Sequence, residues 1–270
     1  MPMLLLTLVG IAARGDDLVA SSWWYSGFEN GFPGDPGANE GLGEWLDFAG
    51  PYANFAQDGT DGGQNPNGCA WTILDRDDSE VEPVAGDHIY KGWVYARAQE
   101  SHRAYPCIDV TATLDRPIVN SFMVYLDADY ASLGNREWIS LATWSNTWWN
   151  EGLHTIAVLG SGQLEMAHLD WDYVGPTPQA DFPLRQWVRI TWYLNPVTGG
   201  GDGTVLLWQD GVLTFRGKKP VPSSDKATFH WGMYASGGVD RAVMYNDEIR
   251  LWTLDEPWND PNEEPIWPGG

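Results

Sequence analysis

The segment SHRAYP, at residues 101–106, carries side chains that could hold a negative charge or move a proton. If it is an extended strand, alternation places Arg103 and Tyr105 on one face and His102 on the other. Arginine pairs well with a carboxylate, and histidine or tyrosine can act as a general acid or base. The alternative is a partly exposed strand whose polar side chains pair in the ordinary way.

The segment FHWGMY, at residues 229–234, is the second candidate. Its odd-numbered positions are large and apolar, whereas its even-numbered positions are His230, Gly232 and Tyr234. A face with polar, aromatic and glycine residues is more typical of a ligand-binding surface than of a core. Gly232 would let a ligand approach the backbone closely.

Tryptophan is unusually common, with 17 Trp against 8 Phe. Flat aromatic rings can pack against the C–H faces of sugars, so some of these residues are candidates for ligand contacts rather than core. Adjacent pairs such as Trp23 and Trp24 must point to opposite faces of a strand. Four further candidates for ligand contacts are Tyr193, Gln209, Trp144 and His168.

Glu29 and Asp247 are candidate ligands for a structural calcium ion. The first strand of a β-sandwich often lies beside its last, which would bring residues 26–32 close to residues 245–251. Carboxylates and backbone carbonyls are the ligands that calcium prefers. The alternative is an edge loop with solvated acids.

The chain is strongly acidic: 15 Lys and Arg against 37 Asp and Glu leave a formal charge of −22 over 270 residues. This balance excludes a general nucleic-acid binder and disfavours binding to an anionic membrane. The apolar content of 43% is enough for a packed core. The acidic excess fits a solubilising surface, calcium ligation, or both.

The N-terminus indicates export. Residues 1–15 contain an apolar run that is too short to span a membrane but fits a secretory signal peptide, although it lacks a positive n-region. A buried first strand is the alternative. Two cysteines in a secreted chain predict a disulfide between Cys69 and Cys107, with two free thiols as the alternative.

Short β-branched and aromatic runs, broken by NG, DG, GG and Pro turns, follow one another from residue 69 onward. WQDGVLTF, at residues 208–215, predicts a hairpin at its Asp-Gly turn. No long segment has a helical period. The chain is therefore expected to be all-β, an antiparallel β-sandwich or jelly roll over residues 16–254. The acidic, proline-rich residues 255–270 indicate an extended strap or linker.

Several enzyme motifs are absent from the sequence, among them HExxH, a P-loop, GxGxxG and GxSxG. The ExDxxE type of paired carboxylates is absent as well. A glycoside hydrolase would have to use acids outside such a motif, for example Glu137, Glu165 or Asp170.

The strands resemble those of the concanavalin A-like jelly-roll superfamily, and most closely its polysaccharide-lyase-type proteins, the group of glucuronan, alginate and heparin lyases. The resemblance covers roughly residues 20–254. It rests on SHRAYP, EWISLATW, WVRITWYL with GGGDGTVLLWQDG, FHWGMYAS and YNDEIRLW. It implies an enzyme that cleaves a uronate polysaccharide by β-elimination.

The resemblance also implies roles for individual residues. Arg103, helped by His102, would neutralise the uronate carboxylate, and Tyr234 is similar to the final tyrosine of the YFKAGxY strand of alginate lyases, which serves as acid or base. Two features of those lyases are missing: SLATW stands in place of the QIH triplet, and Tyr105 stands where an RxE pattern has glutamate.

Four functions therefore remain open: a polysaccharide lyase, a noncatalytic carbohydrate-binding domain, a glycoside hydrolase, and a structural or adhesive surface protein. For the lyase, tyrosine acts as a base near neutral pH only if a nearby positive charge lowers its pKa, and Arg103 could supply that charge. A chain of −22 repels an anionic polymer at long range. The binding face must then be locally positive, the medium salty, or the substrate neutral.

Overall fold

The computed structural model describes residues 20–29, 43–45, 68–99, 101–110, 116–134, 137–146, 151–168, 181–197, 201–220 and 227–267. The predicted signal segment at residues 1–15 and Asp170 lie outside these ranges. Within them, strands dominate, and the helical elements are two short 3-10 turns, η1 (Arg76–Asp78) and η2 (Tyr130–Ser132). No helix in the described ranges has the length and apolar character needed to span a membrane.

Two antiparallel sheets account for the strands of the described residues. The eight-stranded sheet has the order β13-β12-β11-β7-β15-β4-β3, and β1 also pairs with β15. Its strands are β1 (Ala20–Ser26), β3 (Cys69–Asp75), β4 (His88–Val94), β7 (Ile118–Ala128), β11 (Trp187–Asn195), β12 (Asp202–Gln209), β13 (Val212–Pro220) and β15 (Ala242–Leu254).

The seven-stranded sheet has the order β10-β9-β8-β14-β6-β2, and β5 also pairs with β14. Its strands are β2 (Gly43–Trp45), β5 (His102–Ala104), β6 (Cys107–Val110), β8 (Trp138–Asn146), β9 (Glu151–Leu159), β10 (Leu164–His168) and β14 (Ala227–Ala235). The two sheets pack face to face, which confirms the predicted antiparallel β-sandwich.

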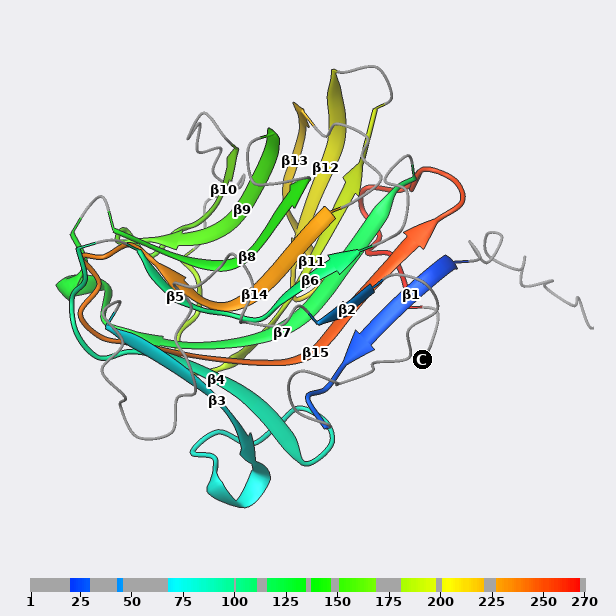
Figure 1. The fold of residues 1–270 in the computed structure, drawn as a ribbon. Coiled ribbons are helices and arrows are strands. Elements are labelled where there is room, and N and C mark those ends of the chain that lie inside the picture. The colour runs from blue at the N-terminus through cyan, green and yellow to red at the C-terminus, as the bar shows by residue number, and fades with distance from the viewer. Residues whose placement is uncertain are drawn as a thin grey trace, which may run out of the picture.

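Both sheets curve in the same sense, and the seven-stranded sheet lies on the inner side of the curve (Figure 1). Its outer surface is called here the concave face. The opposite surface of the sandwich, the outer side of the eight-stranded sheet, is called here the convex face.

A stack of three aromatic rings joins the two sheets at the centre of the core. Trp231 of β14 lies parallel to Trp24 of β1, with ring centroids 5.7 Å apart, and Phe229 extends the stack at 6.2 Å from Trp231. The Trp231 indole N–H donates to the side-chain oxygen of Asn120 over 3.0 Å, so its polar atom is satisfied inside the core. This packing fixes which face of β14 turns inward.

The turn chemistry of the sequence agrees with the hairpins. β12 and β13 pair across Asp210 and Gly211, whose φ angles are 50° and 80°. Positive φ at both central residues is typical of the tight turn predicted for Asp-Gly. The expected neighbourhood of the first and last strands is also confirmed, because β1 pairs with β15 with Trp24 opposite Leu251.

The C-terminal segment, residues 255–267, packs on the convex face. The Trp258 backbone N–H donates to the Tyr193 hydroxyl over 3.0 Å, and the Trp267 ring lies 5.3 Å from that of Trp252. Glu264 accepts hydrogen bonds from Arg189 and Thr191. The segment contacts a second apolar cluster that lies outside the main core and comprises Val119, Tyr193, Leu206, Trp208, Trp252 and Leu254.

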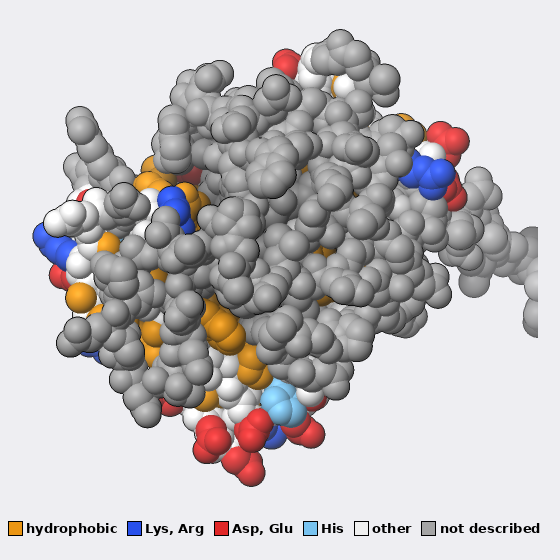
Figure 2. Space-filling view, viewed as in Figure 1, with side chains coloured by type: hydrophobic (Ala, Val, Ile, Leu, Met, Phe, Trp, Pro, Cys, Tyr) orange, Lys and Arg blue, Asp and Glu red, His pale blue; other side chains and the backbone are white. Residues whose placement is uncertain are grey.

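Acidic side chains gather at the lower end of the molecule in Figure 2, where Figure 1 places the loop between β3 and β4. Asp75, Asp77, Asp78, Glu80 and Asp87 of this region are all exposed. One group of exposed acids in the described residues therefore lies at this end of the sandwich.

Candidate functional site

Strands β5 and β14 bring the two predicted segments together on the concave face. Arg103 and Tyr234 are direct partners across the ladder, and Tyr234 in turn lies opposite Ser140 of β8. His102 and Ala104 are fully buried, whereas Arg103 is partly exposed, so the predicted alternation of SHRAYP is confirmed.

Three rings form a cluster beside Arg103. Tyr105 stacks on His230 with centroids 3.9 Å apart, and Tyr234 meets both of them edge-on, at 5.3 Å from Tyr105 and 5.4 Å from His230. The arrangement follows from the chain, because β5 ends at Ala104 and the carbonyl of Pro106, just after Tyr105, accepts from the backbone N–H of Trp231 on β14. We refer to Arg103, Tyr105, His230 and Tyr234 as the ring cluster.

Burial is unequal within the ring cluster. His230 is fully buried and Tyr105 is nearly so, whereas Arg103 and Tyr234 are partly exposed. A polymer that lies on the concave face would therefore meet Arg103 and Tyr234 first.

The pKa values of two residues in the ring cluster, His230 and Tyr234, are shifted so that the neutral form of each is favoured. Burial lowers the pKa of His230 well below its ordinary value, and the charge of Arg103 lowers it further. Burial raises the pKa of Tyr234, against the opposing effects of the Arg103 charge and of hydrogen bonds with Ser101 and Arg103. At neutral pH, His230 is therefore a neutral imidazole and Tyr234 a protonated phenol. Arg103 is close enough to lower the pKa of Tyr234, as expected, but the increase caused by burial is larger.

Gly232 has a different role from the one predicted. It has a φ of +95° at a break in the register between β14 and β8, and an added Cβ would lie 2.7 Å from the Tyr90 ring. The absence of a side chain thus makes room for Tyr90 in the core, and the expectation that Gly232 faces a ligand was wrong. The bulge keeps Trp231 and Met233 in the core and Tyr234 on the opposite face.

Four neighbours of the ring cluster were not predicted. The Trp138 ring packs edge-on against Tyr234 at 4.7 Å. A ladder of hydroxyl groups runs across the strands, from Ser140 to Thr143 and from Thr143 to Thr155, at 3.2 Å each. For Ser140 and Thr143, the signal in the sequence is the alternation of small polar residues with apolar ones in β8.

Two residues proposed for the site lie in the interior instead. His102 is fully buried, and its Nε2 lies 2.8 Å from the Val239 carbonyl oxygen. Trp144 is fully buried in the main core, with its ring 6.4 Å from that of Phe229. Strand alternation explains both, because each is next to a residue that faces outward.

Tyr193 and Gln209 lie in the wrong sheet for the predicted role. They belong to β11 and β12 of the eight-stranded sheet, and the Tyr193 hydroxyl accepts from Trp258 on the convex face. The sequence predicted strands correctly but could not assign each strand to one of the two sheets. His168 lies in β10, opposite His154 of β9, and its side chain is outside the described residues.

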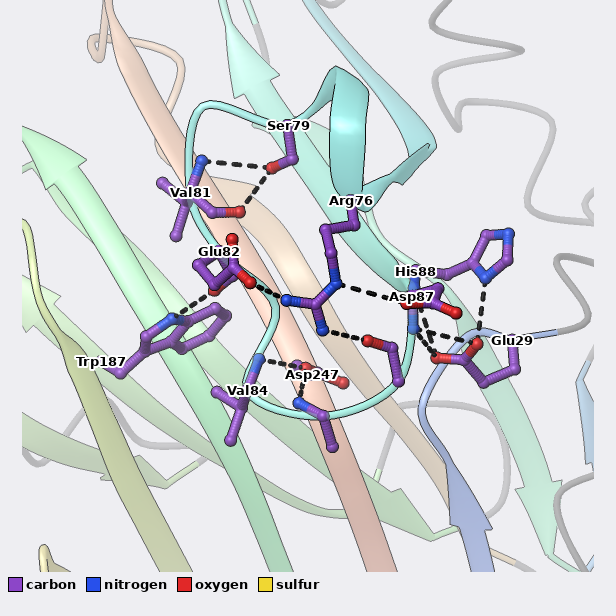
Figure 3. Close-up of polar contacts among 12 residues, drawn as sticks. Glu29, Arg76, Ser79, Val81, Glu82, Val84, Asp87, His88, Trp187 and Asp247 are labelled. Carbon is purple, nitrogen blue, oxygen red and sulfur yellow. Dashed lines mark hydrogen bonds and ion pairs between the residues drawn. The ribbon is translucent and has the colours of Figure 1, made fainter.

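The two predicted calcium ligands, Glu29 and Asp247, lie against the same loop between η1 and β4 (Figure 3). Asp247 Oδ2 accepts from the N–H groups of Val84 and Ala85, at 2.8 and 3.1 Å. Glu29 accepts from the N–H of Asp87 and lies 3.0 Å from His88 Nδ1. Each carboxylate therefore fastens a different part of the loop.

The donor chemistry of this region fits calcium in part. Burial raises the pKa of Asp247 to about 7, although three backbone N–H groups that bond its carboxylate oppose the shift. Such a carboxylate would gain from a cation. However, no group of three or more His, Cys, Asp or Glu side chains suited to a metal occurs in the described part of the chain. A calcium ion here would need carbonyl or water oxygens besides Glu29 and Asp247.

Cys69 is a free thiol in the structure, so the predicted Cys69–Cys107 disulfide is not formed there. The thiol is buried, its sulfur accepts from the Arg103 N–H over 3.2 Å, and burial raises its pKa to about 11. The two cysteines belong to strands of different sheets, β3 and β6. The side chain of Cys107 is outside the described residues.

No protein-family model and no curated protein matches the chain by sequence. Similar solved structures include an endo-β-1,4-glucuronan lyase from the fungus Trichoderma reesei, with 15% identity, 68% of this chain and 87% of that chain covered, and a TM-score of 0.49. Another is the alginate lyase AlgAT5 of polysaccharide lyase family 7, with 10% identity, 68% and 94% coverage, and a TM-score of 0.44.

The matches are not confined to lyases. The binding domain of botulinum neurotoxin serotype G also matches, with 9% identity, 70% of this chain and 44% of that chain covered, and a TM-score of 0.44. Function has to be argued from the residues of this chain.

Proposed function

We propose that the protein is a secreted polysaccharide lyase that cleaves a uronate-containing polymer by β-elimination. The observation that carries the proposal is the pairing of Arg103 with Tyr234 on the concave face, beside the rings of His230 and Tyr105. A cation, a neutral base and a neutral acid within one small area are the groups that this reaction needs.

Arg103 would bind the carboxylate of the uronate. Its partly exposed side chain lies on the concave face, and its buried Nε has no hydrogen-bond partner in the structure. Partial neutralisation of the carboxylate makes the proton on the adjacent C5 easier to remove, because negative charge develops there in the transition state. Arg103 is thus the electrostatic part of the mechanism.

His230 and Tyr234 would move the protons. Neutral His230 accepts the C5 proton, the C5 electrons form the C4–C5 double bond, and the C4–O4 bond breaks. Protonated Tyr234 donates its proton to the departing O4. Their rings are 5.4 Å apart, so they can act on neighbouring carbons of one sugar. Tyr105, stacked on His230, is the positioning residue in this scheme.

The direct test follows the ultraviolet absorbance of the unsaturated uronate at the new chain end. Purified protein is incubated separately with several uronate polymers and with neutral polymers as controls. The proposal expects absorbance to rise with time for at least one uronate polymer. No rise with any uronate polymer would reject it.

A noncatalytic carbohydrate-binding domain is the second candidate, and one observation favours it. Trp138 lies beside Tyr234 as a partly exposed aromatic surface, whereas His230 is fully buried. In that case, the concave face would bind a polymer without cleaving it. Affinity for a polymer in calorimetry, together with no absorbance change, would identify this function.

The proposal also includes a structural calcium ion at Glu29 and Asp247. It is supported by two carboxylates that fasten one loop and by the cost of ionising buried Asp247. The ion would hold the loop between η1 and β4 in place. Residues 1–15 as a signal peptide would deliver the protein outside the cell, where its polymer substrate is found.

A further inference from the structure

Glu137 comes directly before β8 and is fixed at both its backbone and its side chain. Its N–H donates to the Gly134 carbonyl and its own carbonyl accepts from the Gly160 N–H, at 2.9 Å each. Its carboxylate accepts a hydrogen bond from the Ser236 hydroxyl and lies so close to Gly238 that an added Cβ there would overlap it. The carboxylate therefore packs against the part of the chain that follows β14.

The Ser236 hydroxyl connects this carboxylate to Trp138, the first residue of β8. The hydroxyl accepts from the Trp138 N–H over 3.1 Å, and the Ser236 N–H donates to the Trp138 carbonyl over 3.0 Å. A serine hydroxyl has one hydrogen to donate and lone pairs with which to accept, so it can bond the carboxylate and the Trp138 N–H at the same time. Glu137 and Ser236 thus fix the start of β8 relative to the end of β14.

Trp138 in turn packs against Tyr234. Both side chains are partly exposed, whereas Ile139 and Ala235 beside them are fully buried, so strand alternation places both rings on the concave face. Because Ala235 lies opposite Ile139, Trp138 and Tyr234 are diagonal neighbours across the ladder. Their rings meet edge-on with centroids 4.7 Å apart. Glu137 is therefore connected to Tyr234 by an unbroken series of direct contacts.

We infer that Glu137 is a positioning residue for the Tyr234 phenol and acts through Ser236 and Trp138. The catalytic consequence of this inference rests on the proposed function. A general acid is effective only while its proton lies within reach of the departing oxygen, so a small displacement of the phenol lowers the rate. Without the hydrogen bond from Ser236 to Glu137, the Trp138 ring loses the support that keeps it against Tyr234.

Kinetics with a uronate polymer that the protein cleaves test the inference. Glu137→Ala should lower kcat by roughly 10- to 100-fold, as for a misplaced catalytic group, while KM stays within about twofold. Glu137→Gln should keep kcat within about threefold, because its amide oxygen can still accept from Ser236. Ser236→Ala removes the middle of the connection and should reproduce the loss. Glu256→Ala, at an exposed acid of the C-terminal segment, is the matched control and should change neither constant.

A double-mutant cycle separates positioning from a general effect on the fold. If Glu137 acts through Tyr234, Glu137→Ala should change kcat by less than about twofold in the Tyr234→Phe background, because no acid remains to be placed. A loss that is as large in that background as in the unsubstituted protein would overturn the inference. Equal losses in Glu137→Ala and Glu137→Gln would overturn it as well.

The environment of the phenol can also be measured without a substrate. The ultraviolet absorbance of the Tyr234 phenolate is followed over the alkaline range in which circular dichroism shows the fold intact, as the difference between each variant and the same variant carrying Tyr234→Phe. Burial raises the pKa of Tyr234, so Glu137→Ala, which loosens its cover, should let the phenol ionise at lower pH. Glu137→Gln removes the same charge but keeps the hydrogen bond, so it should shift the titration by clearly less. The groups that contact this ring from the ring cluster, Arg103, Tyr105 and His230, are the same in all variants.

The inference and the lyase proposal can fail separately. If the unsubstituted protein cleaves no uronate polymer, the lyase proposal is rejected, and the titration decides whether Glu137 positions the phenol: a shift in Glu137→Ala supports it, and an unchanged titration overturns it. If the polymer is cleaved but Glu137→Ala changes neither kcat nor the titration, the lyase proposal stands and the inference is rejected.

Discussion

Tyr234 lies where one side chain could both contact the polymer and transfer a proton to it. It is partly exposed, it pairs with Arg103, and its phenol stays protonated because burial raises its pKa. The structure therefore favours Tyr234 as a general acid, whereas the sequence alone allowed it to be either an acid or a base. The same reasoning makes neutral His230 the base.

Tyr234→Phe should lower the turnover number by about 10²–10⁴-fold, the usual contribution of a general acid. The melting temperature should stay nearly unchanged, because the ring and its packing against Trp138 remain. Turnover by the absorbance assay and thermal melting check the two parts. Tyr95→Phe, at an exposed tyrosine, is the control; full activity in Tyr234→Phe would remove Tyr234 from the mechanism.

Arg103 also sets the pH at which the base works. Because its charge helps to lower the pKa of His230, the imidazole is neutral and active down to acidic pH. In Arg103→Gln, the pKa of His230 should rise, and the acid limb of the kcat/KM profile should move to higher pH. A limb that stays in place, measured from pH 4 to 8, would show that His230 is not the group that titrates.

At the scale of elements, the bulge at Gly232 determines which residues of β14 reach the concave face. Gly232→Ala should lower the free energy of unfolding by about 1–3 kcal/mol, because alanine is strained at positive φ. Its methyl group would also meet the Tyr90 ring. Chemical denaturation measures the change.

Gly134→Ala is the matched control for Gly232→Ala. Among the described residues, its added Cβ would meet Glu137 alone, at an ordinary contact distance of 3.5 Å, and its φ is not in the left-handed region. Equal effects of the two substitutions would show that the bulge carries no particular strain.

The loop between η1 and β4 is the element that a calcium ion would stabilise. If Glu29 and Asp247 hold the ion, a chelator should lower the melting temperature by about 5–10 °C when calcium had been present at about 100 times its dissociation constant. Asp247→Asn should remove this response, and Asp202→Asn, an exposed acid on β12, should keep it. A melting curve unaffected by chelator would argue against the ion.

Alternation within single strands was predictable from the sequence, and it placed Arg103 with Tyr105 and His230 with Tyr234 correctly. The pairing of strands was not, because it depends on contacts between distant parts of the chain. For that reason Tyr193 was expected near the site but lies in the other sheet. Trp144 was misplaced for another reason, since the composition could not say which tryptophans fill the core.

At the scale of the whole molecule, the segment 255–267 is part of the fold rather than a free extension. It covers Tyr193, Trp252 and the other members of the second apolar cluster on the convex face. An apolar surface of this kind tends to self-associate when it is uncovered. The strand pattern alone could not show that a proline-rich tail has this role.

A chain that ends at Leu254 should therefore melt at a lower temperature and form dimers or larger species. Light scattering and analytical ultracentrifugation measure the association. Ile266→Ser in the full chain is the control, because Ile266 is 85% exposed and its replacement uncovers nothing. A monomeric truncated chain with an unchanged melting temperature would contradict the role given to the segment.

The central strand β15 follows the other described strands in the chain, yet β1, β4 and β7 all pair with it. Until β15 has been synthesised, the edges of these strands that will pair with it remain without their hydrogen-bond partners. Contacts between residues so far apart slow folding and prolong the exposure of sticky edges. Folding of this protein is accordingly expected to be slow, and its intermediates are expected to aggregate until β15 is in place.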